Sequence, residues 1–151
     1  MASCRVLLID DAPPTLSLLR GILRNLGVLE LQSYAKAEQA LAVLESGEYK
    51  ADLVLIDGIA GPLDGCSFTQ TLRQATRPDM RMLPVVIVTG RTTEQEVRAA
   101  IEAGVSDYIV KPVSLDTVRR KLVGVMKDPR SLRERRDAAA ATPKSGTSRG
   151  R

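Results

Sequence analysis

The chain has 151 residues, a mass of 16.3 kDa and a formal net charge of +4, and this length fits one domain with a short extension. It has no histidine and two cysteines, which excludes Ser-His-Asp and Cys-His catalysis and leaves too few ligands for the usual four-ligand zinc site. No apolar run approaches the roughly 20 residues of a membrane helix, so we expect no membrane contact. We also expect a cytoplasmic location, where the two cysteines stay as reduced thiols.

Five short apolar runs are the expected strands. A weak run near residues 28–31 alternates with polar residues, and this pattern predicts a strand at an edge of the sheet. The other four lack such alternation, which indicates that both of their faces are buried, as in a central parallel sheet. These four runs are residues 6–9, 53–56, 84–88 and 108–110.

Apolar residues at helical spacing lie between these runs. The first stripe, over residues 16–26, follows two prolines, which cost no hydrogen bond at the start of a helix. Strand and helix alternate five times, which predicts an α/β fold with a doubly wound, five-stranded parallel sheet and helices on both faces. The other helical stripes cover residues 37–44, 68–75, 97–101 and 115–122, and helix ends are expected at Gly27, Gly47 and Gly104.

Residues 129–151 differ in composition from the rest of the chain. They carry seven Arg or Lys residues against two acids, whereas residues 1–128 carry 15 basic and 16 acidic residues. This segment has almost no large apolar side chain to offset the entropy of ordering, so we predict a basic, disordered tail, of which residues 131–141 are the part that could prolong the last helix. The body has no basic stripe with interleaved aromatic residues, so we expect no direct contact with nucleic acid.

Reactive side chains directly follow the predicted strands. Asp10 and Asp11 come after the first run, Asp57 after the third, Thr89 after the fourth and Lys111 after the fifth. Ligands of open α/β sheets bind beyond the carboxyl ends of the strands, so we expect these side chains at one edge of the sheet. A single aspartate in such a place commonly caps a helix or a turn, but five reactive residues together favour a functional site.

The three aspartates predict a metal site. Carboxylates within a few ångströms repel one another, and their pKa values rise unless a cation neutralises them. Hard oxygen ligands with few protein donors suit Mg²⁺, which keeps several waters and also binds phosphate oxygens. The sequence therefore predicts a pocket for Mg²⁺ and a phosphoryl group.

Four spaced motifs, VLLIDD, LVLIDGIAGPLDG, VVIVTGR and DYIVKP, resemble those of the receiver domain of two-component response regulators, and of its single-domain, chemotaxis-type members in particular. The similarity extends from residue 5 to about residue 126. It implies that residues 1–128 form the receiver domain, with the flavodoxin-like strand order 2-1-3-4-5. In this order Lys111 lies two strands from Asp57, roughly 10 Å away, a distance that only a long side chain spans.

The resemblance also implies a role for each residue of the metal and phosphoryl site. Asp57 would be the phosphoacceptor and would take its phosphoryl group from a sensor histidine kinase or a histidine phosphotransfer protein. Asp10, Asp11 and Asp57 would hold Mg²⁺ together with the backbone carbonyl of Ile59. Lys111 would pair with a phosphoryl oxygen.

The same resemblance implies a switch. Thr89 would turn its hydroxyl toward the phosphoryl group, and Tyr108 would swing inward when Thr89 moves. The fourth helix, fifth strand and fifth helix, roughly residues 91–126, would then bind a downstream protein, with the chain a monomer or weak dimer. Such a protein catalyses only its own phosphorylation and slow dephosphorylation, so we do not expect a turnover enzyme.

Other interpretations use the same residues. An FMN-binding flavodoxin would need a Ser/Thr/Gly-rich phosphate loop after the first strand, where this chain has DDAPPT. A haloacid-dehalogenase-type phosphatase would need a second acid two residues after Asp57, where Ile59 stands. A receiver-like interaction scaffold that is not phosphorylated, and a receiver fragment of a longer response regulator, stay open as alternatives.

Overall fold

The structure of the chain is a computed structural model that describes residues 3–58, 64–90 and 93–141. Every strand is followed by a helix, as the apolar runs predict, and two of the strands are followed by a second helix as well. The strands are β1 (Arg5–Ile9), β2 (Glu30–Tyr34), β3 (Leu53–Asp57), β4 (Val85–Thr89) and β5 (Asp107–Val110). The helices are α1 (Pro13–Asn25), α2 (Ala37–Ser46), α3 (Gly65–Arg73), α4 (Pro78–Arg81), α5 (Glu94–Ala103), α6 (Leu115–Lys127) and α7 (Leu132–Ala141).

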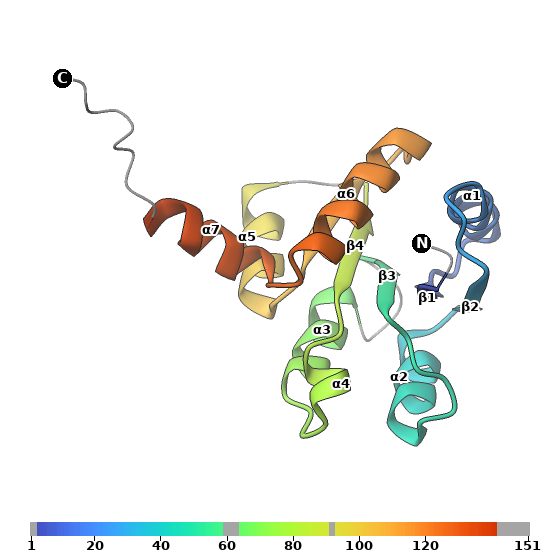
Figure 1. The fold of residues 1–151 in the computed structure, drawn as a ribbon, viewed down its shortest axis with the longest axis horizontal. Helices are drawn as coiled ribbons and strands as arrows, with labels where there is room; N and C mark the ends of the chain where they lie inside the picture. Colours follow the sequence, from blue (N-terminus) through green and yellow to red (C-terminus); the bar gives the residue numbers. More distant parts are fainter. Residues whose placement is uncertain (1–2, 59–63, 91–92, 142–151) are drawn as a thin grey trace.

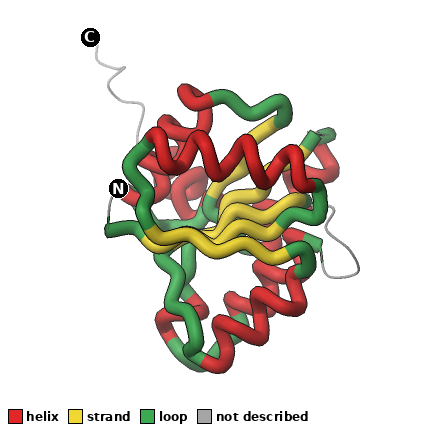
Figure 2. The backbone as a smooth tube through the Cα atoms, turned by 90° about the vertical axis from the view of Figure 1, so that its right-hand side faces the viewer, coloured by secondary structure: helices red, strands yellow, loops and turns green. Residues whose placement is uncertain are grey.

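The five strands form one parallel sheet in the order β2-β1-β3-β4-β5, which confirms the predicted fold class. Figure 2 shows the sheet in the middle of the molecule with helices on both of its faces. Parallel strands have their carboxyl ends at the same edge, so the residues that follow β1, β3, β4 and β5 gather there.

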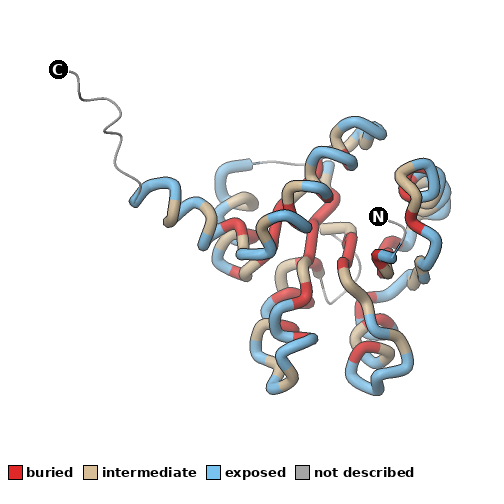
Figure 3. Tube along the Cα trace, viewed as in Figure 1, coloured by how far each residue is buried: buried red, intermediate tan, exposed pale blue. Residues whose placement is uncertain are grey.

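Two apolar cores lie on the two faces of the sheet. On one face, α1 and α6 pack against the strands, with Leu23 and Leu122 fully buried. On the other, α2, α3, α4 and α5 pack around Phe68, which is also fully buried. Figure 3 shows that burial is concentrated in the strands. The central strands are therefore apolar on both faces, and polar side chains appear only where these strands end.

The second strand lies later in the chain than residues 28–31, where it was predicted. β2 begins at Glu30, and Val28 instead donates its N–H to the carbonyl of Leu23 at 2.9 Å, at the end of α1. Gly27 permits this turn with a φ of 94°, in the left-handed region. The expected edge position of this strand is confirmed, because within the described part of the chain β2 pairs with β1 alone.

The chain after α6 also differs from the prediction. Disorder was expected from residue 129, with residues 131–141 as a stretch that could prolong the last helix. Residues 132–141 instead form a separate helix, α7, which lies beside α5 in Figure 1. Leu132 is buried, and its N–H donates to the carbonyl of Val105 at 2.9 Å. One apolar anchor and backbone hydrogen bonds thus order a segment whose composition is polar. The predicted disorder of the last ten residues, 142–151, lies outside the described residues.

No helix within the described ranges is both long and apolar enough to cross a membrane.

Candidate functional site

Three carboxylates meet at the carboxyl edge of the sheet. Asp10 and Asp11 follow β1, and Asp57 is the last residue of β3. One oxygen from each of the three lies within 4.8 Å of the others. The structure therefore brings together the three aspartates that the sequence singled out, although Asp11 and Asp57 are 46 positions apart along the chain.

Local hydrogen bonds hold Asp10 in the site. Its backbone N–H donates to the carbonyl of Tyr34 at 3.1 Å, which continues the pairing of β1 with β2. Its Oδ1 accepts a hydrogen bond from the N–H of Ala12 at 2.8 Å, in the turn that leads to the two prolines at the start of α1. Asp10 is only 2% exposed, whereas Asp11 is exposed. The turn thus fixes one carboxylate inward and leaves its neighbour at the surface.

Lys111 brings a cation to these carboxylates. Its Nζ lies 3.7 Å from Oδ2 of Asp57 and 4.0 Å from Oδ2 of Asp10. Both distances are too long for a hydrogen bond, so the lysine interacts with the two carboxylates through the attraction of opposite charges. Its backbone N–H donates to the carbonyl of Thr89 at 2.7 Å, just past the end of β5. The side chain of Lys111 therefore spans the two strand spacings from β5 to Asp57 at the end of β3, as expected.

The second oxygen of Asp10 has the environment of a metal ligand. Oδ2 is buried and accepts no hydrogen bond from the described residues. Burial raises the pKa of Asp10, and the negative charges of Asp57 and Asp11 raise it further, while the N–H of Ala12 and the charge of Lys111 act in the opposite direction. Three carboxylates that share one lysine, one of them with a buried oxygen that accepts no hydrogen bond from the described residues, fit a hard divalent cation such as Mg²⁺.

Thr89 lies beside the backbone that follows Asp57. The N–H of Gly58 donates to the carbonyl of Val88 at 3.1 Å. A Cβ added at Gly58 would lie 3.5 Å from the Oγ1 of Thr89, so the hydroxyl is close to this glycine. Thr89 is half-buried at the end of β4 and faces the same edge as the carboxylates. Ile59, whose carbonyl was expected near this point, lies outside the described residues.

Tyr108 is half-buried in β5, and its ring packs against the core on the α5 side of the sheet. The Nζ of Lys121 in α6 lies 5.0 Å from the centre of this ring, a cation–π distance. Lys121 also pairs with Asp107 at 3.0 Å. The sequence reasoning missed both charged residues, although an aspartate at the start of an apolar run is a signal for a buried ion pair.

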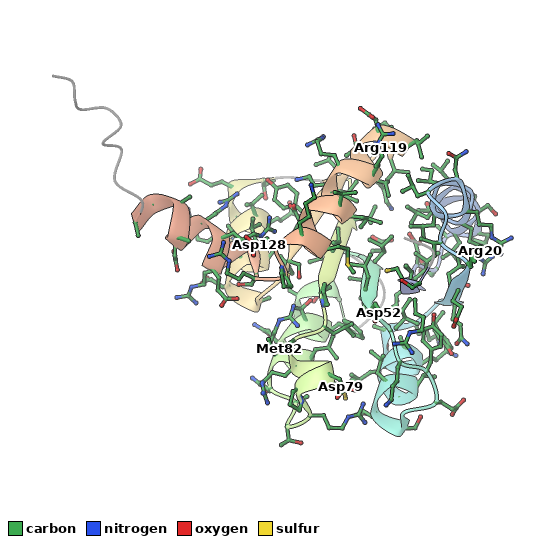
Figure 4. The ribbon with its side chains drawn as sticks, viewed as in Figure 1. Arg20, Asp52, Asp79, Met82, Arg119 and Asp128 are labelled. Carbon is green, nitrogen blue, oxygen red and sulfur yellow. The ribbon has the colours of Figure 1, made fainter. Side chains whose placement is uncertain are left out.

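A second concave region lies away from the carboxylates, near the opposite ends of β1 and β3. This cleft has a volume of about 630 Å³, and Asp52, Asp79 and Met82 of its lining are labelled in Figure 4. Arg5 pairs with Asp52 at 3.2 Å and Arg77 pairs with Asp79 at 3.1 Å, so these charges are matched within the cleft wall. Because these charges already neutralise one another, the edge of the sheet that carries the three aspartates is the better candidate site.

The chain is similar to known proteins over most of its length. The family model described as the response regulator receiver domain matches residues 6–123. The chain is 28% identical over 118 residues to the chemotaxis protein CheY-3 of Vibrio cholerae, which covers 78% of this chain and 88% of that protein. It is 30% identical over 109 residues to the sensor histidine kinase CheAY of Helicobacter pylori, which covers 72% of this chain and 13% of the kinase.

A solved structure also matches with a comparable sequence identity. It is the receiver domain of a sensor histidine kinase from Pseudomonas aeruginosa PAO1, crystallised with a magnesium ion coordinated in its active site cleft. The match has a TM-score of 0.70 at 26% identity and covers 83% of this chain and 98% of that chain.

Proposed function

Because the chain belongs to the response regulator receiver domain family, we propose that it is a signalling switch controlled by phosphorylation of Asp57. The phosphoryl donor would be a phosphohistidine of a sensor histidine kinase or of a histidine phosphotransfer protein, and the chain would act in the cytoplasm. One observation carries the proposal: Lys111 and two other carboxylates surround Asp57 at the edge of the sheet, and a buried oxygen of Asp10 there accepts no hydrogen bond from the described residues.

The proposed step is a phosphoryl transfer to a carboxylate. An oxygen of Asp57 attacks phosphorus and forms an O–P bond, while the P–N bond of the donor breaks and its electron pair stays on the imidazole nitrogen. The Asp57 side chain is 14% exposed, so it remains accessible from the edge of the sheet. Lys111, 3.7 Å away, would stabilise the charge that develops on the phosphoryl oxygens.

Asp10, Asp11 and Asp57 would hold Mg²⁺, together with the backbone carbonyl of Ile59 that the family resemblance implies. When bound, the ion would neutralise charge on the three carboxylates and on the phosphoryl group. The buried oxygen of Asp10 supports this assignment, because it accepts no hydrogen bond from the described residues and a single lysine, 4.0 Å away, is shared with Asp57. The magnesium-bound receiver domain from Pseudomonas aeruginosa offers a precedent in the same fold.

The output of the switch would be a surface that binds a downstream protein. The chain would not bind nucleic acid directly, and it would be a monomer or weak dimer. Thr89 would respond to the phosphoryl group and Tyr108 would follow it. The surface predicted over residues 91–126 corresponds to α5, β5 and α6, because the short helix α4 precedes them. Within this proposal, residues 1–128 are the receiver domain, and the chain has no turnover activity beyond its own phosphorylation and dephosphorylation.

Acetyl phosphate, a small phosphoryl donor, tests the proposal directly. We expect intact-mass spectrometry to show one added phosphoryl group when Mg²⁺ is present, and none when it is chelated or in Asp57→Asn. Asp64→Asn is the matched control, because Asp64 caps α3 through the N–H of Ser67 at 2.8 Å and asparagine caps equally well. Labelling of Asp57→Asn would refute the assignment, and a wild-type chain that never takes up phosphate would instead be an interaction scaffold.

A further inference from the structure

A cluster of three charged residues lies behind Tyr108, outside the phosphoryl site. Asp107 is 8% exposed and pairs with Lys121 of α6 at 3.0 Å. Its other oxygen lies 3.8 Å from a guanidinium nitrogen of Arg135 in α7. A single buried carboxylate therefore interacts with cations from two different helices, and its attraction is divided between them.

The C-terminal helix α7 is attached to β5 at this point. Arg135 donates to the carbonyl of Ser106, and the N–H of Leu132 donates to the carbonyl of Val105 at 2.9 Å. β5 is an edge strand, so α7 covers the beginning of an edge that would otherwise present backbone groups to solvent. In Figure 1, α7 extends beside α5. It thus occupies one end of the α5–β5–α6 surface.

This attachment depends on few contacts. Leu132 is the buried apolar residue of α7, whereas Arg133, Glu134, Arg136 and Asp137 are exposed. A helix of ten residues is marginally stable by itself in water, so α7 depends on its docking contacts. Segments held by few buried contacts open locally at lower free energy than the core does. Loss of one contact at Asp107 is therefore enough to shift α7 toward release.

Tyr108 is connected to the same carboxylate in two ways. Its backbone N–H donates to Oδ1 of Asp107 at 2.8 Å, and its ring lies under Lys121, which pairs with that oxygen. When the ring turns away, Lys121 loses its cation–π contact and Asp107 becomes its main partner. The attraction between the Asp107 carboxylate and Arg135 then weakens.

We propose that α7 is a phosphorylation-controlled occupant of the α5–β5–α6 surface, and that Lys121 and Asp107 are the positioning residues through which Tyr108 controls its release. This inference rests on the proposed function, because phosphorylation of Asp57 is what moves Tyr108. A downstream protein that replaces α7 must supply what α7 supplies: a basic side chain for Asp107 and N–H donors for the carbonyls of Val105 and Ser106.

Amide hydrogen exchange of the full chain, measured by NMR, tests the release of α7. Beryllium fluoride with Mg²⁺ is the probe, as a mimic of the phosphoryl group on aspartate. We expect the Leu132 amide to exchange at least tenfold faster with the probe in the wild type and to stay unchanged in Asp57→Asn. Lys121→Gln removes the charge that competes with Arg135 for Asp107, so in this variant the exchange at Leu132 should be slower without the probe and should no longer speed up with it.

The reverse coupling is measured at Tyr108, because coupling between two sites acts in both directions. The chain has three tyrosines, so 3-fluorotyrosine labelling gives three ¹⁹F signals, and Tyr108→Phe identifies one of them. Arg135→Ala should shift the Tyr108 signal without any probe. Arg133→Ala, an exposed change in the same turn of α7, should leave the signal in place.

The outcomes separate this inference from the proposed function. If the probe shifts the backbone signals of Asp57 and Thr89 while Leu132 exchange and the Tyr108 response to Arg135→Ala stay unchanged, the inference is overturned and the switch stands. If the probe does not bind at Asp57 at all, the proposed function is overturned and the inference falls with it.

Discussion

Replacing Asp10 by asparagine should stabilise the metal-free chain. The buried Oδ2 of Asp10 accepts no hydrogen bond from the described residues and faces the carboxylates of Asp57 and Asp11. Asparagine keeps an oxygen for the N–H of Ala12, which now donates to Oδ1 at 2.8 Å, and it removes the negative charge. Its amide can also donate toward the nearby carboxylates, so the substitution replaces a repulsion by an attraction.

The expected gain in the free energy of unfolding at pH 7 in chelator is about 1–2 kcal/mol, within the usual cost of a buried group without its partner. The gain depends on pH. Because burial raises the pKa of Asp10 in the folded state, its contribution to stability is fully present below the unfolded pKa and is lost as pH rises through the raised value. The advantage of Asp10→Asn should therefore grow between pH 4 and pH 7.

Magnesium should reverse the order of stability. An ion that binds only the folded chain stabilises it by about 2.7 kcal/mol when its concentration is 100 times the dissociation constant. The wild type should gain this amount, whereas Asp10→Asn should gain little. Urea unfolding followed by circular dichroism, in chelator and in Mg²⁺, measures both effects.

Asp11→Asn is the matched control for the metal-free comparison. Asp11 is exposed, so its replacement should change the stability in chelator by less than about 0.5 kcal/mol. The reasoning is refuted if Asp10→Asn lowers the metal-free stability, or if Mg²⁺ stabilises this variant as strongly as the wild type.

Two further predictions address the switch and the fold. Thr89→Ala should leave phosphorylation of Asp57 intact and abolish the ¹⁹F response of Tyr108 to beryllium fluoride; a response of wild-type size would contradict the role of the hydroxyl. Arg73→Met should lower the free energy of unfolding by about 2–4 kcal/mol in urea titrations, because Arg73 donates to three backbone carbonyls that would lose their donor. Arg73→Lys should lose less, and equal losses would show that the carbonyl contacts do not matter.

The central strands could be predicted from the sequence because their environment is simple. A strand buried on both faces needs apolar residues at every position, so residues 6–9 and 53–56 identify it without reference to a partner. The edge strand β2 has no such constraint. It is only partly buried, and its position depended on how α1 ends at Gly27 and Val28, which a periodic pattern does not reveal.

The C-terminal helix was expected only as a stretch that could prolong the last helix, and its separate docking was missed for a different reason. Its composition indicates disorder, and its order depends on contacts with residues far earlier in the chain. Leu132 contacts the backbone at Val105, and Arg135 lies 28 residues beyond Asp107. Contacts of this range leave no periodic signal in the helix itself. A prediction from composition therefore does not reveal that Leu132 and Arg135 anchor this segment to the rest of the domain.

The amino-acid order is enough to tell which chemical groups follow the strands, because a buried parallel strand confines its polar residues to its ends. It thus placed Asp10, Asp11, Asp57, Thr89 and Lys111 at one edge. How the charges are matched depends on the packing of the folded chain, which leaves one buried oxygen of Asp10 without a hydrogen bond from the described residues and divides Asp107 between Lys121 and Arg135. The physical reason is that electrostatic energies depend on distance and burial, and both are set by packing between elements that are remote in the chain.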